Sequence, residues 1–247
     1  MEVHHHPNVE KKNFKEYFLE FLMIFLAVTL GFFAEQMRES FAEHSRETEF
    51  MRSMLEDLKT DTAGINLFYE RSNIVISQID SLMYLIKSPD RNNYGQRMYY
   101  LARVITTGLG RFILRDRTYE EMKSSGSLRL VNDDVLSDSI SKYYATQTEF
   151  KEQAELQLSR MANYTDFATR LFDGYIFQQM LQRHPYKVIP PQGNPQLLTN
   201  DAGTTNQYVG SLHYFSALII INSSRAKMKI GSSTDLIKLI QKKYHLQ

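Results

Sequence analysis

The chain has 247 residues, with 29 Lys and Arg against 28 Asp and Glu, which gives a formal net charge of +1 at pH 7. This balance argues against nucleic acid as a partner, because such binding rests largely on the attraction of basic side chains to phosphates. The absence of cysteine excludes a disulfide framework, a thiolate metal site and a lipid-modified cysteine, and the length leaves room for one sizeable domain or two small ones.

The first sixteen residues form a short tail that contains three adjacent histidines, His4, His5 and His6. They are candidate metal ligands, but zinc sites usually space their ligands so that a turn can close around the ion. A run near a chain end also lacks the neighbouring groups that orient each ring. We therefore expect no cofactor here, and an expression-tag remnant is the other interpretation of the run.

Residues 17–34, YFLEFLMIFLAVTLGFFA, are mostly apolar and carry Glu20 as their one charge. A membrane-spanning helix uses about 17 to 25 such residues, so this segment can cross a bilayer if Glu20 lies at the interface. A cleaved signal peptide and a buried soluble helix are the alternatives. We expect an uncleaved anchor, because cleavage after Ala34 would put Phe32 at a position that needs a small residue. Only a cleavage three residues earlier would be tolerable.

Two small residues lie one turn apart within this segment, Ala27 and Gly31. Small residues at this spacing let two membrane helices approach closely, so we expect the anchor to self-associate and the protein to form a homo-oligomer. The alternative is that Gly31 simply faces lipid.

Charged residues follow the anchor without a helix breaker, so we expect one long helix that continues over residues 35–87 and stops at Pro89. Its apolar residues recur every three or four positions, the spacing of a buried helical face. Residues 35–90 hold eleven acidic against six basic residues, a charge of −5, whereas residues 91–131 and 223–247 each carry +5. We expect helices of opposite net charge to pack side by side in an antiparallel bundle.

A second helix is expected over residues 93–107, ending at two glycines. The glycine spacing is too short for a phosphate-binding loop of the Walker or dinucleotide type. Arg111, Arg115 and Arg117 follow closely and form a candidate anion-binding site. The other interpretation is a solvated connection.

The next segment predicts a short helix over residues 117–125 and a long one over residues 132–182. Thr118 followed by Glu121 fits a capping box for the short helix. Asn132 is expected to cap the long helix, which no proline interrupts and which would reach about 75 Å as a single rod.

Residues 183–203 are rich in proline, glycine and asparagine and are expected to form a surface loop. The last helix is expected over residues 204–245. Its final turns have a basic face, which would pack against the acidic first helix or lie on an anionic membrane surface.

Two stretches together are distinctive: MEVHHHPNVEKKNFKEYFLEFLMIFLAVTLGFFAE at the start and TYEEMKSSGSLRLVNDDVLSDSISKYY in the middle. With the ending LIKLIQKKYHL, they resemble an uncharacterised family of single-pass membrane proteins from Bacteroidota. Members of that family begin with a comparable histidine run and anchor and then carry a helical domain of unknown function. The resemblance covers most of the chain and implies that His4 to His6 are native residues. It implies no reaction, since no catalytic residue is attached to the family.

No catalytic motif stands out in the sequence. There is no GxSxG turn, no HExxH helix, no EF-hand loop and no paired ExxH, and the remaining histidines lack partners by motif. We therefore expect a non-enzymatic scaffold or sensor, an all-α protein whose transmembrane helix continues into a bundle over residues 35–247. It would act through an unidentified membrane or periplasmic protein. The competing class is a helical domain that binds a small anion through the three arginines.

Topology can be predicted from the charges beside the anchor. Lys11, Lys12 and Lys15 precede it, and only Arg38 and Arg46 lie within about 15 residues after it. This bias places the N-terminus in the cytoplasm and the bundle in the periplasm, with the anchor in the inner membrane. A C-terminal reporter that is active only in the cytoplasm should therefore be inactive, and an active fusion would reverse the predicted orientation.

Overall fold

The computed structural model describes residues 13–109 and 114–246, and these form an all-α structure with one small hairpin, as predicted. The chain divides into two compact units, residues 1–49 and residues 50–247. The elements are α1 (Phe14–Lys87), η1 (Arg91–Tyr94), α2 (Gly95–Gly108), α3 (Arg117–Ser124), η2 (Ser127–Leu130), α4 (Asp134–Ala145), α5 (Gln147–Leu171), α6 (Gly174–Gln179), β1 (Leu181–Arg183), β2 (Tyr186–Val188) and α7 (Ala202–Tyr244).

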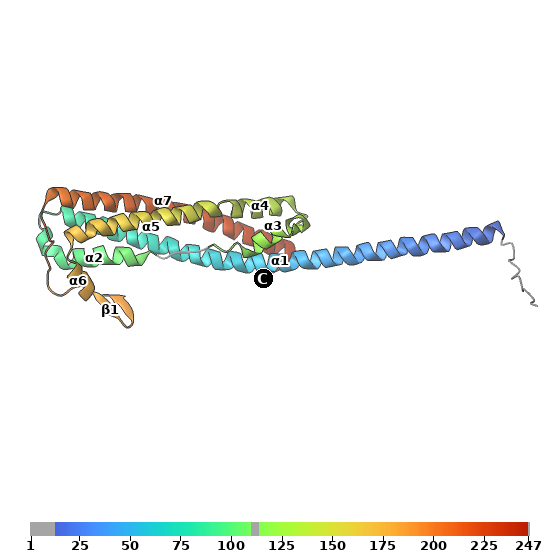
Figure 1. Ribbon diagram of the computed structural model, residues 1–247, viewed down its shortest axis with the longest axis horizontal. Coiled ribbons are helices and arrows are strands. Elements are labelled where there is room, and N and C mark those ends of the chain that lie inside the picture. The colour runs from blue at the N-terminus through green and yellow to red at the C-terminus, as the bar shows by residue number, and fades with distance from the viewer. Residues whose placement is uncertain (1–12, 110–113, 247) are drawn as a thin grey trace, which may run out of the picture. The chain divides into compact units, whose positions relative to one another are not determined.

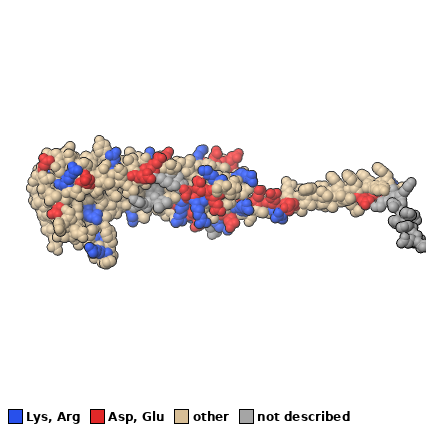
Figure 2. All heavy atoms as spheres, in the orientation of Figure 1, with Lys and Arg blue, Asp and Glu red and all other residues tan. Residues whose placement is uncertain are grey.

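The N-terminal part of α1 makes up the described residues of the first unit. As expected, the apolar segment and the charged residues after it belong to one helix. Apart from the partly exposed Leu22, the large apolar side chains between residues 17 and 34 are widely exposed, from 47% for Leu26 to 74% for Phe32, and Figure 2 shows a surface there with almost no charge. None of the most apolar window is buried, so α1 is a candidate membrane span by length and composition.

The second unit is a bundle of long helices (Figure 1). The part of α1 that follows residue 49 runs in the same direction as α4 and α5, and α7 runs antiparallel to them. Helix α2 lies beside the C-terminal part of α1, while α3 and α4 lie at the opposite end of the bundle.

One end of the bundle is filled by aromatic side chains. Tyr99, Tyr164, Phe172, Tyr208 and Phe215 are all fully buried and come from α2, α5 and α7 or the residue that follows α5. The Tyr99 and Phe172 rings meet edge to face with centroids 4.9 Å apart, an arrangement that ring quadrupoles favour. This cluster joins the C-terminal half of α1 to α2, α5 and α7.

The other end of the bundle has a separate apolar cluster. It joins the part of α1 around Leu55 to α3, α4 and the last turns of α7, where Leu236 and Ile240 are buried. A small third cluster around Ile65, Phe68 and Ala226 contains members from α1 and α7. The three-and-four spacing of apolar residues predicted from the sequence therefore corresponds to the buried faces of α1 and α7.

The prediction of a single helix over residues 132–182 is wrong, because the chain forms α4, α5 and α6 there instead. The first break lies at Thr146, between α4 and α5. In a continuous helix the Tyr143 carbonyl would accept a hydrogen bond from the backbone four residues later. Here it accepts one from the Lys229 ammonium on α7, so a partner distant in the sequence stabilises the break.

The second break lies at Phe172 and Asp173. Phe172 has extended backbone angles and a fully buried ring, which ends α5. The Asp173 side chain then caps α6 by accepting a hydrogen bond from the Tyr175 amide at 2.8 Å. The Asp173 amide itself donates to the Tyr99 hydroxyl at 2.8 Å. Aspartate followed by glycine is a turn signal in the sequence, and it was missed.

The predicted loop over residues 183–203 begins inside a hairpin, in which β1 pairs antiparallel with β2. The rest packs on α2, where the Gln96 side chain donates to the Pro191 carbonyl at 2.8 Å. A Cβ on Gly95 would lie 1.9 Å from the Pro195 carbonyl oxygen, so this close approach requires glycine at position 95.

Two predicted helix caps are also wrong. The cap of α4 is Asp133 and not Asn132, since the Asp133 carboxylate accepts from the Leu136 amide at 3.0 Å. Thr118 makes no capping box, because its hydroxyl donates at 2.6 Å to Asp57 on α1. In the second case a tertiary contact replaces the local one.

The buried hydroxyls of Tyr164 and Tyr208 generate a stability prediction. Tyr164 donates to the Ala102 carbonyl at 2.8 Å and lies 2.9 Å from the Tyr208 hydroxyl, which is then the donor between the two. Tyr164→Phe leaves the buried Tyr208 hydroxyl unpaired, so we expect unfolding free energy to fall by about 1–3 kcal/mol. Tyr208→Phe leaves no orphaned group and should cost only about 0.5–1.5 kcal/mol.

Chemical denaturation of the full chain in detergent, followed by circular dichroism, measures both variants. Equal losses, or a larger loss for Tyr208→Phe, would show that this hydrogen-bond direction is wrong.

Candidate functional site

Of the three predicted anion-binding arginines, Arg115 and Arg117 are exposed, and Arg111 lies outside the described residues. The Arg115 backbone amide donates to both carboxylate oxygens of Asp61 at 3.0 and 3.1 Å.

The predicted metal ligands His4, His5 and His6 also lie outside the described residues. Within residues 13–109 and 114–246, no group of three His, Cys, Asp or Glu side chains could hold a metal ion.

The predicted self-association pair lies in the exposed part of α1. Ala27 and Gly31 are both exposed, and a Cβ built on Gly31 meets nothing within 4 Å. The surface at this pair is therefore open to close approach by a second helix, which stays a prediction.

A buried charged cluster that the sequence did not reveal lies in the middle of the bundle. Lys229 on α7 is 4% exposed and Asp61 on α1 is 5% exposed. The Lys229 ammonium donates to the Tyr143 carbonyl and, at 2.8 Å, to the Thr146 hydroxyl. It also lies 3.4 Å from the centroid of the Tyr143 ring. A cation is favoured here, because the C-terminus of α4 exposes carbonyls with partial negative charge.

Burial shifts the proton affinities of both charged groups. Burial is the main reason that the pKa of Asp61 rises from 3.8 to about 6, although the Arg115 amide opposes the shift. Burial likewise lowers the pKa of Lys229 from 10.5 to about 8, and the charge of Asp61 partly offsets this effect. Each group therefore pays a desolvation penalty that its neighbours only partly compensate.

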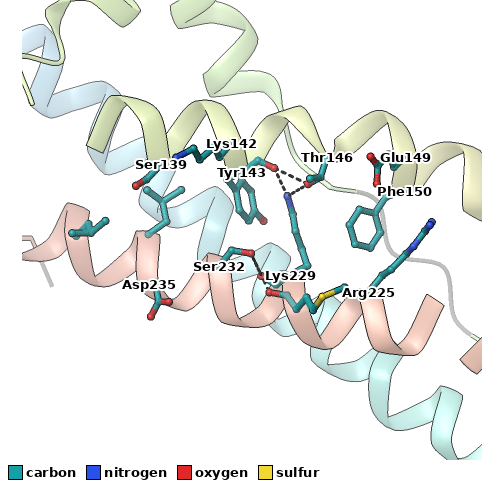
Figure 3. A pocket seen from close by; sticks show the side chains of 13 residues that line it. Ser139, Lys142, Tyr143, Thr146, Glu149, Phe150, Arg225, Lys229, Ser232 and Asp235 are labelled. Atoms are coloured by element: carbon teal, nitrogen blue, oxygen red, sulfur yellow. Dashed lines mark hydrogen bonds between the residues drawn. The ribbon is translucent and has the colours of Figure 1, made fainter. Parts of the chain in front are cut away.

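A cavity of about 430 Å³ lies where α4 and α5 meet, facing α7 (Figure 3). Its wall includes the buried Lys229 and the aromatic rings of Tyr143 and Phe150. Figure 3 shows the Lys229 side chain reaching from α7 to the break between α4 and α5. The other lining residues are Ser139, Lys142, Thr146, Glu149, Arg225, Met228, Ser232, Asp235, Leu236 and Leu239. A volume of this size is typical of small-ligand sites, which are mostly apolar with a few polar groups.

The face of α7 that points away from the core carries two regular columns of residues. The large column consists of large side chains that recur every seven residues and are exposed: Tyr214 is 62% exposed, Ile221 49% and Met228 66%. The small column has the same spacing and lies between the large residues; it consists of Gly210, Ala217, Ser224 and Gly231.

The glycines of the small column have no explanation inside the bundle. A Cβ added at Gly210 or Gly231 meets nothing within 4 Å. Glycine inside a helix costs about 0.5–1 kcal/mol relative to alanine, so both positions weaken α7 without relieving any contact in the described structure. We call Tyr214, Ile221 and Met228 with the small column the α7 outer face.

Sequence reasoning assigned the buried face of α7 and missed the outer face, although its seven-residue spacing is visible in the printed sequence. The signal was hidden because apolar residues on both faces blur the periodicity of the helix. Burial of Lys229 had no such signal, since a lysine among serines in a helix ordinarily faces solvent.

In comparisons with protein-family models, curated proteins and solved structures, the chain gave no significant match.

The shifted pKa of Asp61 predicts a pH-dependent contribution to stability. Between about pH 4 and 6 the folded protein keeps a proton on Asp61 that the unfolded chain has lost. This proton stabilises the folded state at low pH, and the contribution disappears as the pH rises through about 6. In the Asp61→Asn variant the side chain at position 61 cannot titrate, but its amide oxygen can still accept a hydrogen bond from the Arg115 amide.

Thermal unfolding of wild type and Asp61→Asn, measured from about pH 4 to 6.5, isolates this effect. We expect the stability of wild type relative to the variant to fall by on the order of 2 kcal/mol over this range. Parallel pH curves for the two proteins would contradict the assignment.

Proposed function

We propose that this protein is a membrane-anchored, non-enzymatic helical scaffold that assembles with copies of itself through the α7 outer face. Residues 17–34 of α1 would anchor it in the inner membrane, and the bundle would lie in the periplasm. The observation that carries the proposal is the α7 outer face, where large apolar side chains are held exposed beside a column of small residues.

The geometry of this face favours another helix as its partner. Residues that repeat every seven positions stay on one side of a helix that winds around a neighbour. Small residues let the two backbones approach, and large residues then fill the space between them. Burying Tyr214, Ile221 and Met228 would remove apolar surface from water, which is the main driving force for association.

The same pattern also favours a second copy as the partner. In a two-fold symmetric pair, each helix presents the same surface, so the large column of one copy can pack on the small column of the other. The surface is thus complementary to itself. Anchoring both copies in one membrane would raise their effective concentration and favour association further.

A charge in the large column should disrupt this assembly. Ile221→Glu would bury an unpaired carboxylate in the interface, and we expect association to weaken by at least about tenfold. Ile74→Glu is a matched control, because Ile74 on α1 is 57% exposed and lies outside the α7 outer face. Oligomer size is measured by light scattering in detergent and by cross-linking in membranes.

Ala27→Leu combined with Gly31→Leu tests the anchor separately. If this pair alone disrupts the oligomer while Ile221→Glu leaves its size unchanged, the interface belongs to the anchor and the proposal for α7 fails. Circular dichroism checks that each variant keeps its helix content.

A further inference from the structure

The cavity between α4, α5 and α7 carries a separate inference, which rests on different residues except for Met228, a member of both the cavity lining and the α7 outer face. We propose that it is a binding site for a single-chain anionic amphiphile, a carboxylate carried on an aliphatic tail of about eight carbons. Three features of the cavity support this ligand class: a fixed cation in its wall, further cations among its lining residues, and an apolar surface for the tail.

Lys229 supplies the fixed cation. Two hydrogen bonds and the Tyr143 ring hold its ammonium at the end of α4, so the charge is positioned before any ligand arrives. The group is 4% exposed, and a charge in a site of low dielectric attracts an anion more strongly than a charge in water. A site of this kind costs little reorganisation when it binds.

The remaining charged residues favour an anion by a small margin. Lys142 and Arg225 add two cations to the lining, while Glu149 and Asp235 add two carboxylates. With Lys229 the lining carries a net charge of +1. Lys142, Glu149 and Asp235 are exposed and therefore screened by water, whereas Lys229 is buried and acts more strongly inside the cavity, although the buried Asp61 on α1 offsets part of its charge.

The apolar part of the lining fits an aliphatic tail. Phe150, Leu236, Leu239 and Met228 border the cavity, and Met228 is 66% exposed. A volume of about 430 Å³ accommodates one short chain, and each buried methylene contributes roughly 0.8 kcal/mol by leaving water. The tail would therefore cover apolar surface that the free protein leaves open.

The test uses the full chain in lipid nanodiscs, titrated with octanoate by isothermal calorimetry, with empty nanodiscs as the blank. We expect saturable binding with a dissociation constant on the order of 0.1–1 mM, as suits a ligand of about ten heavy atoms. Octyltrimethylammonium has a tail of similar length, one methylene longer, with the opposite charge, and acetate has the same head without the tail. Both should bind at least about tenfold more weakly.

Variants locate the site. Ser139→Trp should fill the cavity and weaken octanoate binding by at least about tenfold, since Ser139 lines it and is only partly exposed. Ser141→Trp is the matched control, because Ser141 is exposed on the same helix and does not line the cavity. Arg225→Gln should weaken binding by a smaller factor, because it removes one cation of the lining.

Four results would overturn the proposal. Equal binding of octanoate and octyltrimethylammonium would show that the cation in the wall does not select the ligand. Unchanged octanoate binding by Ser139→Trp would show that the ligand sits elsewhere, as would an equal loss in Ser141→Trp. Absence of any saturable octanoate binding to wild type would also refute the site.

Discussion

The burial of one face of α7 along its whole length is the constraint on which the rest of the bundle depends. Tyr208 and Phe215 complete the aromatic cluster at one end, Ala226 belongs to the central cluster, and Leu236 and Ile240 close the other end. Because all three clusters share α7, the helix fixes where α1, α2, α4 and α5 can pack. Its opposite face is left exposed for the same reason, since a straight helix cannot bury both sides against one bundle.

In the middle of the bundle the buried face of α7 is polar, and this explains several departures from ideal helix geometry. The Lys229 ammonium and the Thr146 hydroxyl both donate to the Tyr143 carbonyl, so the break at Thr146 and the buried ammonium support each other. The Asp61 carboxylate on α1 offsets part of the charge of Lys229, and it accepts a hydrogen bond from the Arg115 amide. The chain between α2 and α3 is thereby tied to the interior by a backbone group. The side chains of Arg115 and Arg117 are exposed.

Periodic spacing predicted the long helices well, because burial of a stripe every three or four residues is a property of the sequence itself. The breaks were not predicted. The break at Thr146 involves Lys229, a partner distant in sequence, whereas the break at Asp173 carried a local turn signal that was overlooked, in addition to a contact with the distant Tyr99. The predicted capping box at Thr118 is wrong because of a contact distant in sequence: the Thr118 hydroxyl donates to Asp57 on another helix and not to the backbone of its own helix. Of the candidate sites, the candidate membrane span was predictable from composition. The cavity was not, because it forms only where three helices meet.

The division of the core into three clusters also bears on how the bundle comes apart. An apolar core that is interrupted by a polar belt couples its ends less strongly than a continuous one, so each end becomes a separate cooperative unit, or foldon. The aromatic end, with its buried tyrosine pair, contains the larger cluster of buried side chains. The α3–α4 end is then the part that opens first, and amide hydrogens there would exchange with solvent while those around Tyr164 stay protected.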